Sequence, residues 1–465
     1  MKRIVWLAAA LALFAPADAA LAQFSPGARS VGMGGAGMVF ARGVDAIEWN
    51  PANLALEGGW NIALGEAGTS ALVTGADIEA LQDMFEFELP VFTSDGGTAQ
   101  QAVNALPASG LSLATVSEGF LAGSAAETSN GALPSPGKGY PSIGIAWGQF
   151  GVRVRSRVMS DVRLSKELVD LIVNDFDPAR INEYQIGDTG FRSVSFSEIT
   201  AAYGATLGER MALGVSARYV KGHKLTEGRF FEPVLDLVNQ TAEFNSVAIE
   251  APGGSGYGVD IGFALDLMAG LRVSASAVNI IQKMTWDDAL IAHEATFFAC
   301  DCPQSDFDSN PEDLIDQYQA GPVDPASMSL YVAQKAQGLF PGAFFPTVFR
   351  AGVGWRPWSS TAIELVGASV SPQGRQHNQW DERISLGIEQ RLWFLTLRAG
   401  GAKGSDGIQA LSGGVGLGFG PVKLDVSAGM MSGGFEFASG IVTPEDVDYA
   451  GGHVTASLQI MGGGR

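Results

Sequence analysis

The chain has few of the residues that usually carry chemistry. Its 465 residues include two cysteines and four histidines. The histidines share no motif: they are His223, His293, His377 and His453. The sequence contains no GxSxG, HExxH or CxxC motif, so a catalytic site would have to be collected from remote loops. We therefore expect no enzyme activity, no metal site and no cofactor.

The two cysteines, Cys300 and Cys302, are separated by one residue in a polar stretch. A disulfide across so short a spacing would be a strained ring, although an oxidising compartment would permit it. The nearest further metal ligands, His293 and Asp301, do not complete a recognised zinc spacing. A disulfide and a pair of free thiols both remain open.

Basic residues are also scarce. Lysine and arginine number 29 against 49 acidic residues, which gives a formal net charge of -20. Binding to nucleic acid needs a basic face that neutralises phosphates. The composition therefore excludes a nucleic-acid partner and is typical of acidic, solvent-facing loops.

Long hydrophobic runs are absent except at the N-terminus. Lys2 and Arg3 precede an apolar run from Ile4 to Ala15, which is followed by the small-residue sequence Ala20-Leu21-Ala22. This arrangement predicts a secretory signal peptide over residues 1–22. A membrane anchor is the weaker alternative, because about 12 apolar residues fall short of the roughly 20 that a spanning helix needs.

What the chain has instead is alternation. In several stretches every second residue is apolar and those between are polar, charged or glycine, as in residues 349–356, 383–392, 422–430 and 453–460. A period of two places each set on one face of a β-strand. A membrane barrel turns the apolar face to lipid and the polar face to its lumen. A soluble exported β-protein would instead have to bury every apolar face.

The strands number about 14 to 16 when turns and alternation are taken together, in line with bacterial outer-membrane barrels. We predict an all-β fold, a transmembrane antiparallel β-barrel of about 14 strands, over residues 59–461. Short turns should face the periplasm, and polar insertions at 68–108, 164–190, 222–245 and 284–345 should lie at the other end. The long insertion at 284–345 contains helical patterns at residues 311–319 and 326–337.

The segment after the predicted cleavage site carries a family resemblance. It reads GARSVGMGGAG over residues 27–37 and VDAIEWNPANLA over residues 44–55. This closely resembles the start of outer-membrane barrels of the FadL superfamily, which includes fatty-acid and aromatic-hydrocarbon transporters and PorV-like and TraF-like proteins. The resemblance implies that residues 23–58 form a plug inside the barrel. Asn50, Pro51 and Ala52 match the family's NPA motif.

The resemblance resumes at residues 345–357 and continues to about residue 430, where it is similar to the PorV-like branch. It implies a cell outer-membrane location and passive uptake of a hydrophobic or amphipathic, fatty-acid-like small molecule. The alternative is a non-transporting barrel that serves as a docking or secretion-associated scaffold, and the long insertion favours it. The implied partners are outer-membrane lipid, a hydrophobic ligand, and a secretion-system or surface protein.

One predicted strand is unusual because arginines alternate with valines. Its arginines are Arg153, Arg155, Arg157 and Arg163. They cannot face lipid, so we expect them in the lumen. One interpretation is an anion site, since arginine binds carboxylates and phosphates through two hydrogen bonds. The other, which we favour, is structural pairing with lumenal acids such as Asp260, Asp266, Glu389 and Asp425.

Four tryptophans lie near predicted strand ends: Trp355, Trp358, Trp380 and Trp393. Tryptophan is enriched where a membrane protein meets the headgroup region. An interfacial girdle and ordinary hairpin packing both remain open for them.

Overall fold

The structure is a computed structural model, and it describes residues 27–74, 111–118, 142–168, 170, 189–230, 234–236, 241–268, 270–286, 291–300, 345–371, 382–405, 407–438 and 441–462. The predicted signal peptide, residues 23–26 and the helical patterns at 311–319 and 326–337 lie outside these residues. Among the described residues, no helix has the length and apolar character needed to cross a membrane.

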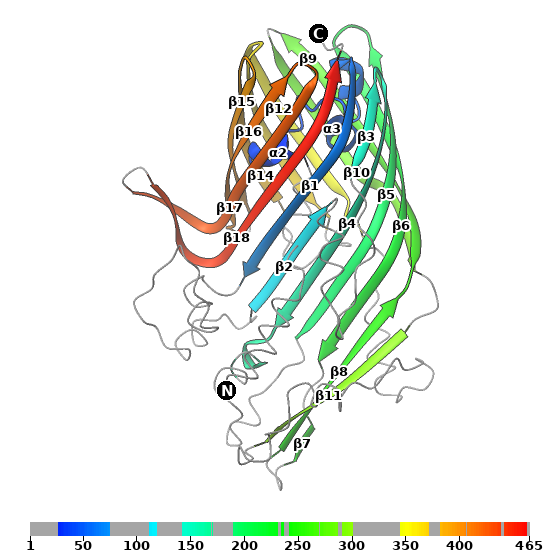
Figure 1. The fold of residues 1–465 in the computed structure, drawn as a ribbon, viewed down its shortest axis with the longest axis vertical. Helices are drawn as coiled ribbons and strands as arrows, with labels where there is room; N and C mark the ends of the chain where they lie inside the picture. Colours follow the sequence, from blue (N-terminus) through cyan, green and yellow to red (C-terminus); the bar gives the residue numbers. More distant parts are fainter. Residues whose placement is uncertain are drawn as a thin grey trace.

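The described chain contains three short helices and a single large sheet (Figure 1). The helices are α2 (Ala28–Gly32), α3 (Val44–Trp49) and α4 (Asn53–Glu57). The first nine strands are β1 (Trp60–Thr74), β2 (Leu111–Glu118), β3 (Ile143–Trp147), β4 (Phe150–Leu164), β5 (Gly190–Leu207), β6 (Met211–Phe230), β7 (Val234–Asp236), β8 (Thr241–Ala251) and β9 (Gly254–Met268). The other nine are β10 (Leu271–Trp286), β11 (Ile291–Cys300), β12 (Val348–Trp358), β13 (Thr361–Val370), β14 (Glu382–Leu392), β15 (Leu395–Gly404), β16 (Gln409–Phe419), β17 (Val422–Ala438) and β18 (Ile441–Gly462).

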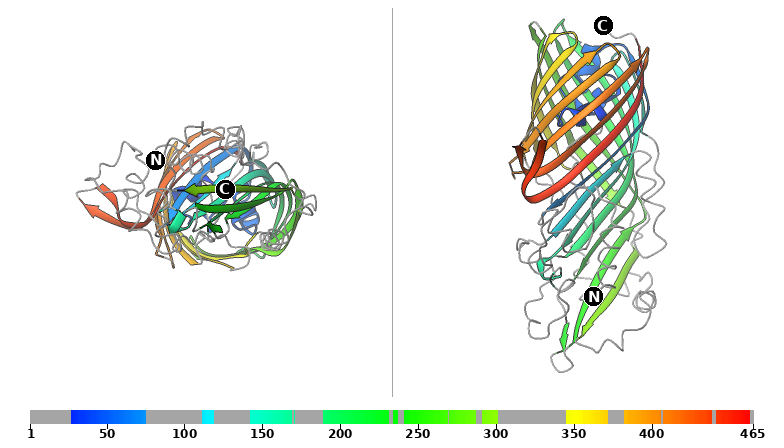
Figure 2. Two further views of the ribbon diagram at one scale, coloured as in Figure 1. Left: turned by 90° about the horizontal axis from the view of Figure 1, so that it is seen from below. Right: turned by 60° about the vertical axis from the view of Figure 1, so that its left-hand side comes forward.

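The sheet closes into a barrel because β18 pairs with β1 along its length. β2 and β3 lie end to end between β1 and β4. β8 and β9 share one position next to β6, and β10 continues into β11 beside them. With the short β7 paired to the edge of β8, the result is a closed antiparallel barrel of 14 strands, which confirms the predicted fold class. Two views in Figure 2 show its oval section and tilted strands.

The faces of the wall are inverted relative to a soluble protein. On β4, Val152 is 43% exposed and Arg153 is 1% exposed; on β17, Val426 is 46% exposed and Asp425 is 1% exposed. Apolar side chains therefore cover the outside while charged and polar side chains fill the inside. A surface of this kind is stable only in lipid, so the chain is a transmembrane barrel of the outer-membrane type.

Short turns gather at one end of the barrel. They connect β3 to β4, β5 to β6, β9 to β10, β12 to β13, β14 to β15 and β16 to β17. Aromatic side chains stand outward beside them, including Trp147, Trp355, Trp358 and Trp393. Exposed aromatics at one level of the wall form an interfacial girdle, so Trp355, Trp358 and Trp393 favour that interpretation over hairpin packing. Trp380 lies outside the described residues.

Several strands run further than the sequence indicated. β1 continues to Thr74, β6 continues to Phe230, and β10 and β11 occupy the first part of the predicted insertion at 284–345. These predicted boundaries were wrong because the added segments are polar and lack clean alternation. Pairing with a neighbouring strand holds them in place, and the local sequence does not show that pairing.

Candidate lumenal site

Residues 27–58, here called the lumenal segment, lie inside the barrel at the end with the short turns (Figure 1). Its helices pack against the inner faces of β4, β5, β6 and β15 to β17. The segment contains seven glycines and nine alanines or valines, and it buries larger apolar side chains such as Phe40, Ile47 and Trp49. Two further features hold it: close backbone packing and ion pairs.

The close packing occurs where the wall offers glycine. A β-carbon on Gly400 would overlap the Met33 carbonyl, and one on Gly214 would overlap the backbone at Pro51 and Ala52. Because glycine has no side chain, the backbone of the segment can lie directly against the backbone of the wall at these positions. Many wall glycines face the segment in this way, including Gly144, Gly151, Gly204, Gly262, Gly354 and Gly387.

The predicted motif Asn50-Pro51-Ala52 lies within this contact. The Asn50 side-chain amide donates to the Phe263 carbonyl at 2.8 Å, and its oxygen accepts the Ala52 backbone N–H at 3.1 Å. The Asn50 side chain thus attaches the turn to β9 and also closes the turn by bonding to Ala52. Pro51, between these two residues, restricts the backbone of the turn. The motif is a fastening point between the segment and the wall.

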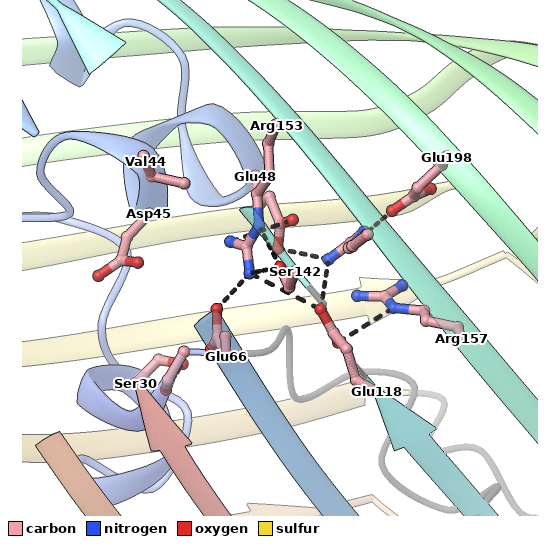
Figure 3. Close-up of polar contacts among 12 residues, drawn as sticks. Ser30, Val44, Asp45, Glu48, Glu66, Glu118, Ser142, Arg153, Arg157 and Glu198 are labelled. Atoms are coloured by element: carbon pink, nitrogen blue, oxygen red, sulfur yellow. Dashed lines mark hydrogen bonds and ion pairs between the residues drawn. The ribbon is translucent and has the colours of Figure 1, made fainter. Parts of the chain in front are cut away.

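Arg153 meets the segment at Glu48 (Figure 3), and Arg155 contacts the same carboxylate. The Glu48 carboxylate lies 3.2 Å from Nη1 of Arg153 and 2.5 Å from Nη1 of Arg155. Arg153 also pairs with Glu66 of β1, and Arg155 with Glu198 of β5. Each arginine therefore joins the lumenal segment to the wall through two or more carboxylates.

Glu118 of β2 completes this cluster. Its carboxylate lies 3.3 Å from Nε of Arg157 and 3.6 Å from Nη2 of Arg153. Arg163 lies at the far end of β4, half-buried and away from the segment. Three of the four predicted arginines therefore gather around glutamates, and the fourth stands apart.

The acids that hold these arginines differ from those named from the sequence, so that part of the expectation was wrong. Asp260 pairs with Arg218, Asp266 with Arg272, and Asp425 with Arg398 and Lys423. Glu389 pairs with Arg29, Arg391 and Arg398. The correct partners lie on β1, β2, β5 and α3, and only the closure of the barrel brings those elements next to β4.

Burial alone would raise the pKa of Glu48, but the positive charges of Arg153 and Arg155 outweigh it and lower the pKa to about 2. Glu48 is therefore ionised at neutral pH. An ionised carboxylate between two buried guanidinium groups is a strong electrostatic contact.

Two further ionic clusters hold the segment. Arg29 of α2 lies 2.7 Å from Glu364 of β13 and 3.0 Å from Glu389 of β14. Glu57 of α4 lies 2.7 Å from Arg272 of β10 and 3.1 Å from Arg356 of β12. Together with Glu48, these contacts fasten all three helices to different parts of the wall.

Beyond the segment, toward the end with the long connections, the inner wall becomes apolar. A buried cluster there comprises Met159, Val194, Phe196, Val220, Leu225, Ala251 and Met284, with Val116, Trp286 and Phe345 packed against it. Met159 lies on the same face of β4 as Arg155 and Arg157, so this cluster belongs to the lumen. Sequence reasoning missed it because its residues come from six strands and show no local motif.

No group of side chains in the described part of the chain has the composition of a metal site. The described histidines His223 and His453 instead lie against serines: Nε2 of His223 is 2.7 Å from Ser197 Oγ, and Nε2 of His453 is 3.1 Å from Ser412 Oγ. The predicted absence of a cofactor remains an expectation.

Comparison with solved structures identifies the architecture. The toluene transporter TbuX of Ralstonia pickettii superposes with a TM-score of 0.51 at 13% identity, covering 95% of this chain and 99% of that one. A FadL homologue of Pseudomonas aeruginosa gives a TM-score of 0.47 at 10% identity, covering 94% and 98%. No protein-family model matches the chain, and no curated protein matches it.

The chain thus has the fold of the toluene transporter TbuX, a barrel of the kind that its N-terminal and C-terminal motifs predicted. The fold and the lipid-facing wall confirm the outer membrane as its location. The PorV-like branch assignment stays a prediction.

Proposed function

We propose that the barrel mediates passive uptake of hydrophobic or amphipathic small molecules across the outer membrane. The observation that carries the proposal is the apolar cluster around Phe196 and Met284, which lines the lumen beside an otherwise charged interior. A water-filled pore has no use for such a lining, whereas a hydrophobic solute gains free energy by entering it. The toluene transporter TbuX, which shares the fold, supports the same class of solute.

The lumenal segment would act as the plug in this proposal. It is held by hydrogen bonds, ion pairs and packing, so it can shift without breaking a covalent bond. The inward route would run from the apolar cluster to the segment and out at the end with the short turns. No energy source is required, because the solute moves down its own gradient.

Uptake of radiolabelled dodecanol by Gram-negative cells that lack their own fatty-acid importer tests the proposal. Cells making this barrel should accumulate dodecanol faster than cells with an empty vector. Phe196→Asn, which places an amide in the apolar lining, should lower the rate several-fold. Phe196→Leu keeps the lining apolar and is the matched control, so its rate should stay near that of the wild type.

Equal uptake with and without the barrel, in cells where it is correctly inserted, would contradict a transport function. That result would favour the alternative, a docking or secretion-associated barrel, whose long insertion lies largely outside the described residues.

A further inference from the structure

Two lysines on the outer wall of the barrel lack an acidic partner. Lys221 of β6 and Lys283 of β10 are both exposed, and in the part of the chain that the structure describes no carboxylate oxygen lies within 4.0 Å of either ammonium group. Lys224, further along β6, differs from them because it pairs with Glu250 of β8 at 2.7 Å. The two unpaired lysines therefore leave a local positive potential on the outside of a protein whose net charge is -20.

The register of the sheet brings these two lysines together. Lys221 is paired with Ser255 of β9, and Lys283 is paired with Tyr257, two residues further along the same strand. A single strand, β9, thus separates the two lysines, and the spacing and rise of β-strands place their α-carbons about 12 Å apart. Two long, flexible side chains at this spacing can reach one head group from both sides.

Two tyrosines complete the patch. Tyr219 of β6 and Tyr257 of β9 are paired with each other and are 52% and 50% exposed. Tyr219 precedes Lys221 by two residues and Tyr257 lies opposite Lys283, so all four side chains stand on the outward face of the wall. Tyrosine is enriched at membrane interfaces because its ring is apolar and its hydroxyl is polar. Tyr219, Lys221, Tyr257 and Lys283 are here called the outer patch.

The outer patch lies at the boundary of the apolar band that is opposite the short turns. On four adjacent strands the outward residue changes there from apolar or aromatic to polar within one step of two residues: Ile199 to Ser197, Tyr219 to Lys221, Tyr257 to Ser255 and Ile281 to Lys283.

The height of this boundary agrees with the thickness of a membrane. Lys221 lies ten residues after Met211, the first residue of β6 at the end with the short turns. With a rise of about 3.3 Å per residue and a strand tilt of about 40°, this distance corresponds to a height of about 25 Å, which is the height of the apolar band in outer-membrane barrels. Short turns face the periplasm in such barrels, so the outer patch meets the head groups of the outer leaflet.

The chemistry of the outer patch fits phosphate. An ammonium group is a compact charge with three donors, and it binds phosphate oxygens as a point charge. Basic side chains at a membrane surface attract anionic lipids, and each adds to the affinity. Two lysines on either side of one strand fit a head group with two phosphates. Ile261 and Ile281, exposed on the same strands nearer the short turns, offer an apolar surface for acyl chains.

We infer that the outer patch binds the head group of a diphosphorylated, multiply acylated glycolipid of the lipid A type in the outer leaflet, with one phosphate at each lysine. The tyrosine hydroxyls lie beside the sugar part of the head group, where they can donate hydrogen bonds. The acyl chains follow the apolar wall as those of any neighbouring lipid do, so selectivity resides in the head group. The site is on the outside of the wall, and the inference is independent of the proposed uptake through the lumen.

Diphosphoryl and monophosphoryl lipid A separate the phosphates from the rest of the lipid, because the two share their sugars and acyl chains. We would titrate each into the purified barrel in detergent and measure the bound fraction by native mass spectrometry. Replacing both lysines, Lys221→Gln and Lys283→Gln in one chain, should weaken diphosphoryl lipid A about 30-fold, the factor expected from two lysines at a lipid surface. Each single change should weaken it about fivefold, and the wild type should bind monophosphoryl lipid A about fivefold more weakly than the diphosphoryl form. Lys221→Arg with Lys283→Arg keeps both charges, so its affinity should stay within about threefold of the wild type.

Lys403→Gln is the matched control, because it removes an exposed lysine from β15, which does not adjoin β6, β9 or β10. Its affinity for diphosphoryl lipid A should change by less than about twofold. Phosphatidylcholine, which has no net charge, should bind to all variants alike. The inference is overturned if the double glutamine variant binds diphosphoryl lipid A as the wild type does, or if Lys403→Gln loses as much. An equal loss of phosphatidylcholine, or displacement of the lipid by excess inorganic phosphate, would also contradict a site for this glycolipid.

The dependence on salt gives a second readout. Attraction between exposed charges is screened as ionic strength rises. The affinity of the wild type for diphosphoryl lipid A should therefore fall steeply when sodium chloride is added, and that of the double glutamine variant should change little. Equal salt dependence in the two chains would assign the binding to other charges and refute the role of the outer patch.

Discussion

Replacing Glu48 with glutamine removes the charge that joins α3 to Arg153 and Arg155. Arg153 then retains Glu66 and Glu118, and Arg155 retains Glu198. Removing one partner of a buried pair costs about 3–5 kcal/mol when the other charge is left alone. The retained partners reduce that cost, so we expect Glu48→Gln to weaken docking of α3 by about 2–3 kcal/mol.

A loss of this size raises the population in which α3 has left the wall by roughly 30- to 150-fold. The assay is the reaction of a cysteine at Ala46 with a maleimide, in a chain that lacks Cys300 and Cys302. Ala46 is fully buried, so its reaction reports the open population as long as opening and closing are fast. The rate should rise by the same factor in Glu48→Gln.

Two controls define the result. A cysteine at Ser359, exposed in the turn between β12 and β13, should react at one rate in both backgrounds. Glu382→Gln removes an exposed glutamate from β14 and should leave the Ala46 rate unchanged. If Glu48→Gln also leaves that rate unchanged, the ion pairs do not hold α3, and close packing against glycine must do so alone.

Three further outcomes follow from the same structure. Val426→Lys, in the outward face of β17, should destabilise the barrel by about 2–4 kcal/mol in a bilayer, measured by urea unfolding in liposomes, whereas Ser359→Lys should have little effect; equal effects would contradict the lipid-facing assignment. Because the pKa of Glu48 is lowered to about 2, its contribution to docking is complete above the ordinary glutamate value of 4.5 and is lost as pH falls from there toward 2. Pepsin cleavage of the lumenal segment should therefore rise over that range, and the rise should be smaller in Glu48→Gln. Gly400→Ala should displace the segment and speed labelling of a cysteine at Ala36, whereas Gly413→Ala, whose added carbon would meet only the Arg398 carbonyl at 3.7 Å, should not.

The local sequence was sufficient to predict the strands of the wall, because these follow from the alternation of apolar and polar residues. The alternating stretches at 349–356, 383–392, 422–430 and 453–460 agree closely with β12, β14, the first part of β17 and the last part of β18. Their alternation reflects one wall with lipid on one side and a polar lumen on the other, and each residue meets that environment independently of its partners. The number of strands and the inward position of the β4 arginines follow from the same pattern.

The candidate site depended on contacts between distant residues. Glu48 and Arg155 are 107 positions apart in the chain, and Glu364 lies 335 positions from Arg29. No periodicity assigns a carboxylate to one arginine over another, and the acids chosen from the sequence were wrong for that reason. The pairing was decided by which strands the closed barrel places beside α2, α3 and α4.

The same division applies to Arg350. In the sequence it is one of several arginines that alternate with apolar residues, and nothing in its neighbours distinguishes it from Arg356 or Arg398. In the barrel, Arg356 meets Glu57 and Arg398 meets Glu389 and Asp425, whereas Arg350 meets a tryptophan ring and a backbone carbonyl. The sequence determined that these arginines face inward, because lipid excludes charge. Which of them meets a carboxylate was decided by the tertiary structure, because that depends on the distance to acids carried by other strands.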